Sequence, residues 1–84
     1  MEKDVVIINF NVAKKNINVD LEVSLNISAN ELVIALNKAY NLGINTEDIK
    51  SCYLKSERPI SLLKGNKPLS YFGVRNGTVI NYTE

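Results

Sequence analysis

The sequence predicts an α+β fold in which one helix packs across one face of a mixed sheet. Three observations lead to this prediction: a well-marked helix over 28–42, two alternating segments before it, and several short apolar segments separated by turn residues after it. A helix of this length is marginal alone in water. The strands must therefore supply its partner surface, and we expect four or five of them.

The helix is marked at both ends. Ser28 followed by Glu31 has the spacing of a capping box, and Ile27 and Leu32 have the spacing of a hydrophobic staple. Gly43 suits a left-handed stop after the last apolar residue. At about 100° per residue, one stripe of the helix is apolar and should be buried. Its members are Ala29, Leu32, Val33, Leu36, Ala39 and Tyr40.

Two alternating segments precede the helix. Residues 4–12 begin with four apolar residues and then alternate, which predicts a central strand with Val6, Ile8, Phe10 and Val12 facing inward. Residues 17–25 alternate cleanly, which is typical of a half-exposed antiparallel strand. The polar segment 13–16 between them predicts a turn, and the pair predicts a hairpin.

The second half of the chain predicts shorter elements. After a polar loop over 45–48, residues 49–57 form a predicted third strand with Cys52 and Leu54 inward. Pro59 restricts the next strand to an edge position. We then expect an edge strand over 60–63, a non-strand turn over 69–74 that places Leu69 and Phe72 in the core, and a last strand over 78–82 after the Asn76–Gly77 turn.

This order allows the first and last strands to lie side by side in parallel at the centre of the sheet. The predicted architecture is therefore an α+β, ubiquitin-like β-grasp fold, with a mixed four- to five-stranded sheet packed on the helix at about 28–42. Its 84 residues are enough for one small domain, which we expect to span 1–84.

The composition argues against several classes of function. A net charge of +1 with dispersed lysines gives no footprint for nucleic acid or an anionic membrane, and no apolar run reaches the length of a membrane span. Direct membrane insertion is therefore not expected. The acidic start does not resemble a signal peptide, which favours a cytoplasmic location. One cysteine and no histidine argue against a disulfide and against a zinc site, so we expect no metal and no cofactor.

Catalysis also has few candidate residues. The alternation places Cys52 inward with no histidine to activate it, which favours a small buried hydrophobe over a nucleophile. Glu47 and Asp48 are adjacent in a loop, where a solvated turn or a helix-end cap is a better interpretation than an acid/base pair. We therefore predict no catalytic residue and a protein that is not an enzyme.

A binding surface is a stronger candidate. In a β-grasp sheet, Val5, Ile7, Tyr53 and Val79 lie on neighbouring strands on the face away from the helix, and we expect an apolar patch there, edged by lysines 50 and 55. The alternative is that these residues were selected only for strand propensity. Ile34 interrupts the polar face of the helix and is a candidate for a second contact.

Three stretches resemble a known family. The opening DVVIINFNV, the junction NISANELVIALNKAYNLGI and the ending PLSYFGVRNGTVINYTE are similar to the YukD/EsaB group of small ubiquitin-like proteins. The ending is the most specific, with a leucine, an aromatic–glycine turn, the Asn76–Gly77 pair and a final apolar strand. The resemblance implies a cytosolic accessory or regulatory component of the type VII secretion system of Gram-positive bacteria.

The resemblance also implies protein partners among the membrane-embedded and ATPase parts of that machinery, or among its regulators, and recruitment to the inner face of the membrane through them. It implies no catalytic residue. An alternative class is a sulfur carrier or protein modifier, but those proteins react through a C-terminal Gly-Gly, and this sequence ends at Asn81-Tyr82-Thr83-Glu84. A detached portion of a larger membrane protein is a third possibility. For the oligomeric state we expect a monomer or a weak dimer.

Overall fold

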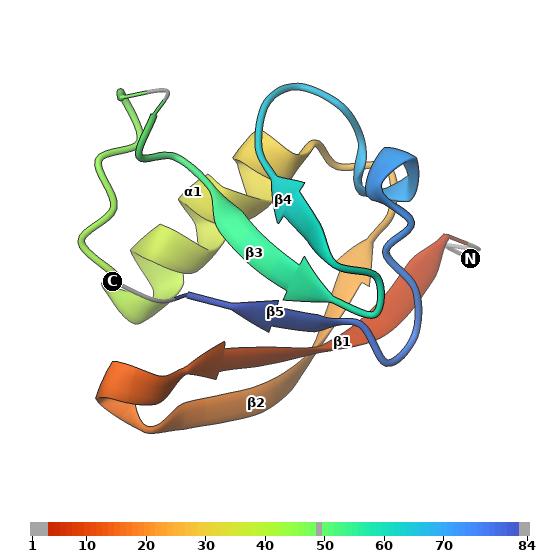
Figure 1. Ribbon diagram of the computed structural model, residues 1–84, viewed down its shortest axis with the longest axis horizontal. Coiled ribbons are helices and arrows are strands. Elements are labelled where there is room, and N and C mark those ends of the chain that lie inside the picture. The colour runs from red at the N-terminus through yellow and green to blue at the C-terminus, as the bar shows by residue number, and fades with distance from the viewer. Residues whose placement is uncertain (1–3, 49, 83–84) are drawn as a thin grey trace.

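The computed structural model describes residues 4–48 and 50–82, and these form five strands and one α-helix (Figure 1). Two of the strands precede the helix and three come after it. Short 3₁₀ turns at Ala13–Lys15 and Leu69–Phe72 complete the chain. In chain order the main elements are β1 (Val5–Val12), β2 (Ile17–Ser24), α1 (Ala29–Tyr40), β3 (Leu54–Glu57), β4 (Ser61–Leu63) and β5 (Val79–Asn81).

The strands form one mixed sheet in the order β2-β1-β5-β3-β4. β1 and β2 form the predicted antiparallel hairpin, and β1 and β5 run parallel at the centre, where Asn9 lies opposite Val79. β3 is antiparallel to both β5 and β4. The predicted β-grasp arrangement is therefore confirmed, including the edge position of β4.

One face of the sheet and the apolar stripe of α1 enclose a single core. The four inward residues predicted for β1 are all buried, and Phe10 lies with its ring centroid 5.3 Å from that of Tyr40 on α1. Leu69 is fully buried as expected, whereas Phe72 is only partly buried against the core. The buried residues of the helix are Ala29, Leu32, Val33 and Leu36, which belong to the predicted stripe.

The helix begins as predicted and ends earlier. The Glu31 amide donates to the Ser28 hydroxyl at 3.0 Å and the Ser28 amide donates to the Glu31 carboxylate at 2.9 Å, so the capping box is formed. The left-handed residue that ends the helix is Asn41, at φ 54°, and not Gly43, although Gly43 also has a positive φ in the next loop. The prediction that Ala39 is buried is wrong, because its side chain is exposed.

The third strand is shorter than predicted. The strand begins at Leu54 and not at position 49, which lies outside the described residues. The reason is a turn around Asp48: its carbonyl accepts the amides of Ser51 and Cys52 at 2.9 and 3.0 Å, and its carboxylate accepts the amide of Lys50 at 3.0 Å. These amides are therefore not available to the sheet. Cys52 is nevertheless buried, as its predicted inward position requires.

The other two late strands differ from prediction only at their ends. β4 starts at Ser61, one residue later than predicted, and β5 covers Val79–Asn81 within the predicted 78–82. The Tyr82 amide still donates to the Asn11 carbonyl at 3.0 Å, which extends the contact with β1. Within the described residues, α1 is too short and too polar to cross a membrane, and no other helix there could do so.

Candidate functional site

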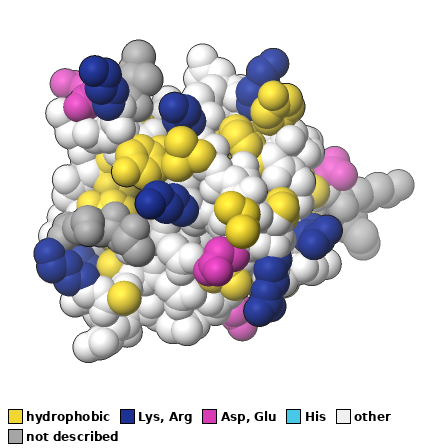
Figure 2. Space-filling view, viewed as in Figure 1, with side chains coloured by type: hydrophobic (Ala, Val, Ile, Leu, Met, Phe, Trp, Pro, Cys, Tyr) yellow, Lys and Arg dark blue, Asp and Glu magenta, His cyan; other side chains and the backbone are white. Residues whose placement is uncertain are grey.

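The predicted patch belongs to the face of the sheet opposite α1, here called the outer face. In Figure 1 the helix lies behind β3, so the view is onto this face, and Figure 2 shows hydrophobic side chains there separated by charged ones. The alternation of β1 places Val5 and Ile7 on the outer face. Ile7 is 44% exposed, and Val5 is partly buried.

Ile7 and Val79 lie close together on this face. Parallel pairing places Asn9 opposite Val79, so Ile7 is one step back on the same face of the neighbouring strand. The turn that leads into β5 holds Ile7 in place, since the Ile7 amide donates to the Asn76 side chain at 2.7 Å and the Gly77 amide donates to the Ile7 carbonyl at 3.0 Å. The structure therefore brings Val5, Ile7 and Val79 together at one end of the outer face.

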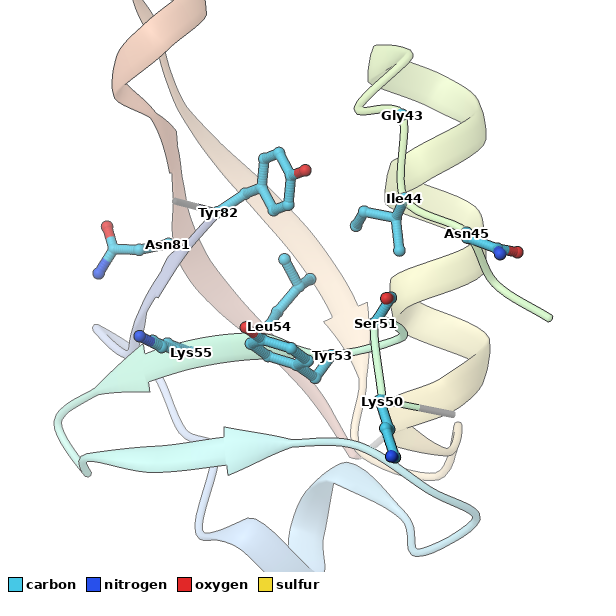
Figure 3. A pocket seen from close by; sticks show the side chains of 10 residues that line it. All are labelled: Gly43, Ile44, Asn45, Lys50, Ser51, Tyr53, Leu54, Lys55, Asn81 and Tyr82. Carbon is cyan, nitrogen blue, oxygen red and sulfur yellow. The ribbon is translucent and has the colours of Figure 1, made fainter. Parts of the chain in front are cut away.

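Tyr53 lies elsewhere. Lys55 is opposite Asn81, so Tyr53 precedes the start of β3 at the end of the sheet away from Ile7. It lines a hollow of about 340 Å³ whose walls come from the loop after α1, the approach to β3 and the end of β5 (Figure 3). Lys50 and Lys55, the two lysines that were predicted to edge the patch, both line this hollow. Its lining residues are Gly43, Ile44, Asn45, Lys50, Ser51, Tyr53, Leu54, Lys55, Asn81 and Tyr82.

Ile34 is also separate from the patch. It is 42% exposed. At about 100° per residue, position 34 lies roughly opposite the middle of the stripe formed by the buried residues of α1. The sheet packs on the buried stripe. Ile34 and the outer face of the sheet thus point to different sides of the molecule.

Asparagines form a polar band between the two ends of the outer face. The Asn9 side-chain amide donates to Asn18 at 2.7 Å and to the Asp20 carboxylate at 3.1 Å, and it accepts from Asn11 at 2.9 Å. On the other side of the sheet centre, Asn81 donates to the Glu57 carboxylate at 2.9 Å. These side chains satisfy one another, so the band is ordered without a partner.

Sequence reasoning missed a second apolar area on the outer face. Ile60 is 90% exposed and Leu62 is 40% exposed, and both line a hollow of about 550 Å³ along β3 and β4. Leu62 lies opposite Lys55 in the sheet. A signal was present, because in the run Ile60-Ser61-Leu62-Leu63 strict alternation places the first and third residues on the same face.

Cys52 and Asp48, which were considered as catalytic candidates, both make local hydrogen bonds within the fold. The Cys52 thiol is buried, it donates to the Asn30 side-chain oxygen at 3.0 Å, and burial raises its pKa. It is therefore a thiol and not a thiolate near neutral pH. Asp48 caps its own turn. Across residues 4–48 and 50–82, no three acidic, cysteine or histidine side chains lie close enough together to hold a metal ion.

The structure of this chain is similar to those of ubiquitin-like domains. No protein-family model matches the sequence, and no curated protein matches it. A ubiquitin-like domain from tubulin-binding cofactor B superposes with a TM-score of 0.71 at 18% identity, covering 93% of this chain and 87% of that one. The ubiquitin-like domain of Plasmodium falciparum Dsk2 gives 0.60 at 17% identity, covering 94% and 99%. The chain therefore has the ubiquitin-like β-grasp fold.

Proposed function

We propose that this chain is a single ubiquitin-like domain over 1–84 that binds other proteins through its outer sheet face and performs no catalysis. The observation that supports this proposal is the position of Ile7, which is 44% exposed beside Val79 and Val5 on a face that the helix leaves open. Exposed apolar side chains gathered on adjacent strands are typical of partner surfaces.

The environment of Ile7 adds a physical reason. The Asn76–Gly77 turn holds the Ile7 backbone in place. A partner that covers the Ile7 side chain therefore loses little binding free energy to ordering of the strand. The neighbouring asparagine band supplies polar groups at the rim, as partner surfaces commonly do. We propose Tyr53 as a contact at the other end of the face and Ile34 as a separate contact on the helix side.

We further propose that the partner belongs to the type VII secretion machinery of Gram-positive bacteria, or regulates it, and that the chain acts as a cytoplasmic accessory component. Membrane recruitment would then occur through protein partners. Support for this finer assignment comes from the resemblance of the strand–helix junction and of the ending to the YukD/EsaB proteins. In the absence of the partner we expect a monomer or a weak dimer.

The test is an affinity capture from native extract of Gram-positive cells that carry a type VII system. The bait is either the wild-type chain or a triple variant, Val5→Ser, Ile7→Ser and Val79→Ser, after circular dichroism has shown the variant to be folded. We expect the wild type to retain secretion components and the variant to lose them by about tenfold or more, because most of the apolar contact is removed.

Ile60→Ser is the matched control, since it removes an equally large and even more exposed isoleucine from the same face, outside the proposed patch. It should capture as well as the wild type. If the triple variant captures normally, the site at Val5, Ile7 and Val79 is wrong, and single Tyr53→Ser and Ile34→Ser variants then test the other two contacts. If the wild type captures partners unrelated to type VII secretion, the finer assignment is wrong while protein binding stands.

A further inference from the structure

Part of the apolar surface of α1 is not covered by the sheet. Ala35 and Ala39 are both exposed, and they lie on the side of α1 that is next to the edge strand β2. Between this flank and β2 lies an apolar groove of about 350 Å³. Leu21 and Leu36 line the groove with the two alanines, and Leu21 is only partly buried although it is on the inner face of its strand.

The edge of β2 is open along the same groove. The sheet order places β2 outermost, with β1 as its neighbour among the described strands. The Leu25 amide donates to the Asp4 carbonyl at 2.7 Å, so these two residues form a hydrogen-bonded pair. Hydrogen-bonded and non-hydrogen-bonded pairs alternate along two antiparallel strands, and the register therefore shows which residues of β2 direct their backbone groups toward β1. The amides and carbonyls of Asn18, Asp20 and Glu22 therefore point to the open side, where an added strand can pair with them.

The side chains of β2 define the chemistry of such a strand. On the outer face β2 carries Asp20 and Glu22, and Asp20 is held in place by a 3.1 Å bond from Asn9. An added strand would place alternate side chains next to these carboxylates and the others over the apolar groove. Basic residues fit the first set and apolar residues the second.

Two registers in which β2 pairs with the β2 strand of a second copy bring like charges together. Antiparallel pairing of β2 with itself about Leu21 places Asp20 opposite Glu22 twice, and pairing about Glu22 places that carboxylate opposite itself. Like charges directly opposite each other destabilise a strand pair. The carboxylates thus disfavour self-pairing in these two registers and favour a basic partner.

We propose that the β2 edge and the groove against α1 form a second binding site, distinct from the outer-face patch, for an extended protein segment of alternating apolar and basic residues. The segment adds a sixth strand beside β2, buries its apolar side chains against Ala35 and Ala39, and places its basic side chains next to Asp20 and Glu22. This site shares no residue with Val5, Ile7 and Val79, so either proposal can fail without the other.

The probe is a synthetic peptide of about seven residues that alternates lysine and valine, added to the ¹⁵N-labelled chain at up to about 1 mM. A peptide with glutamate in place of lysine is its control. We expect the lysine peptide to shift the amide signals of β2 and of the Ala35–Ala39 flank, with no effect of the glutamate peptide. The Asp20→Lys, Glu22→Lys variant should reverse this preference, with about a tenfold loss for the lysine peptide.

Ala39→Arg fills the groove from an exposed helix position and should abolish the shifts. Ala13→Arg makes the same change in the β1–β2 turn, also at an exposed residue, and should leave binding unchanged. The proposal is overturned if neither peptide binds, if both bind equally, if Ala39→Arg and Ala13→Arg behave alike, or if the shifts map to Val5, Ile7 and Val79 instead of β2. Dilution-dependent line widths from β2 self-pairing would also overturn it.

Discussion

The Thr78 hydroxyl donates a hydrogen bond of 2.8 Å to the Arg58 carbonyl, although the two residues are 20 positions apart. The same oxygen accepts the Arg75 amide at 3.0 Å, and the Thr78 side chain is fully buried. One hydroxyl therefore joins the turn before β5 to the turn between β3 and β4. A valine would have nearly the same shape but could neither donate nor accept.

Replacing this hydroxyl should destabilise the fold. We expect Thr78→Val to lower the free energy of unfolding by about 1–3 kcal/mol, because the Arg58 carbonyl and the Arg75 amide lose their partner. Thr78→Ser keeps the hydroxyl and should cost less, about 1 kcal/mol for the lost methyl group. Urea denaturation followed by circular dichroism measures both. A valine variant at least as stable as the serine variant would contradict this account.

The end of the helix offers a second test. Asn41 ends α1 at φ 54°, where β-branched residues are strained and glycine is not. We expect Asn41→Gly to change thermal stability little and Asn41→Val to destabilise by about 1–2 kcal/mol. Asn66→Val, at an exposed loop position without a positive φ, is the control for the added apolar surface. Equal stability of the two Asn41 variants would show that backbone strain is not the cause.

The start of the helix and its end are not equally predictable. The capping box involves Ser28 and Glu31, which are three residues apart, so the interaction is local and visible in the sequence. Asn41 and Gly43 can both adopt a positive φ, and which one ends the helix depends on the loop beyond. That loop is held by Asn37, whose side chain bonds both backbone groups of Ile44, at 2.9 and 3.2 Å.

The candidate site is predictable only in part for a similar reason. Alternation is enough to place Ile7 on the outer face, and parallel pairing of the end strands then brings Val79 beside it. The position of Tyr53 along the sheet depends instead on the register of β3 against β5 and on the Asp48 turn, which shortens β3. Register between distant strands is non-local, and the composition of the strand does not determine it.

The buried thiol provides a third prediction. Because Cys52 is buried and its pKa is raised, thiolate is scarce in the folded chain, and a disulfide reagent should react on the order of 10²-fold or more slowly than in urea-unfolded chain. The rate is measured by absorbance with a chromogenic reagent at pH 8. Asn30→Ala is the companion variant, since it removes the acceptor 3.0 Å from the thiol sulfur. Equal rates in folded and unfolded chains would contradict burial of this side chain.

Acid should weaken the capping box in a defined direction. Two hydrogen bonds lower the pKa of the Glu31 carboxyl below its ordinary value: the larger effect comes from the Ser28 backbone amide and the smaller one from the Ser28 side chain. A carboxyl whose pKa is lower in the folded state stabilises the fold above its unfolded pKa. That contribution is lost as the pH falls through the folded pKa, so the window lies below about pH 5.

Glu31→Gln tests this directly, since glutamine keeps a side-chain oxygen for the cap without the titration. We expect the wild type to be more stable than Glu31→Gln at neutral pH and the difference to shrink as the pH is lowered from about 6 to 3. Urea denaturation at a series of pH values gives the two curves. Ser28→Ala, which removes the other half of the box, should cost about 1 kcal/mol at neutral pH. A difference between wild type and Glu31→Gln that stays constant across this range would show that the charge of Glu31 does not contribute, and that the cap acts through hydrogen-bond geometry alone.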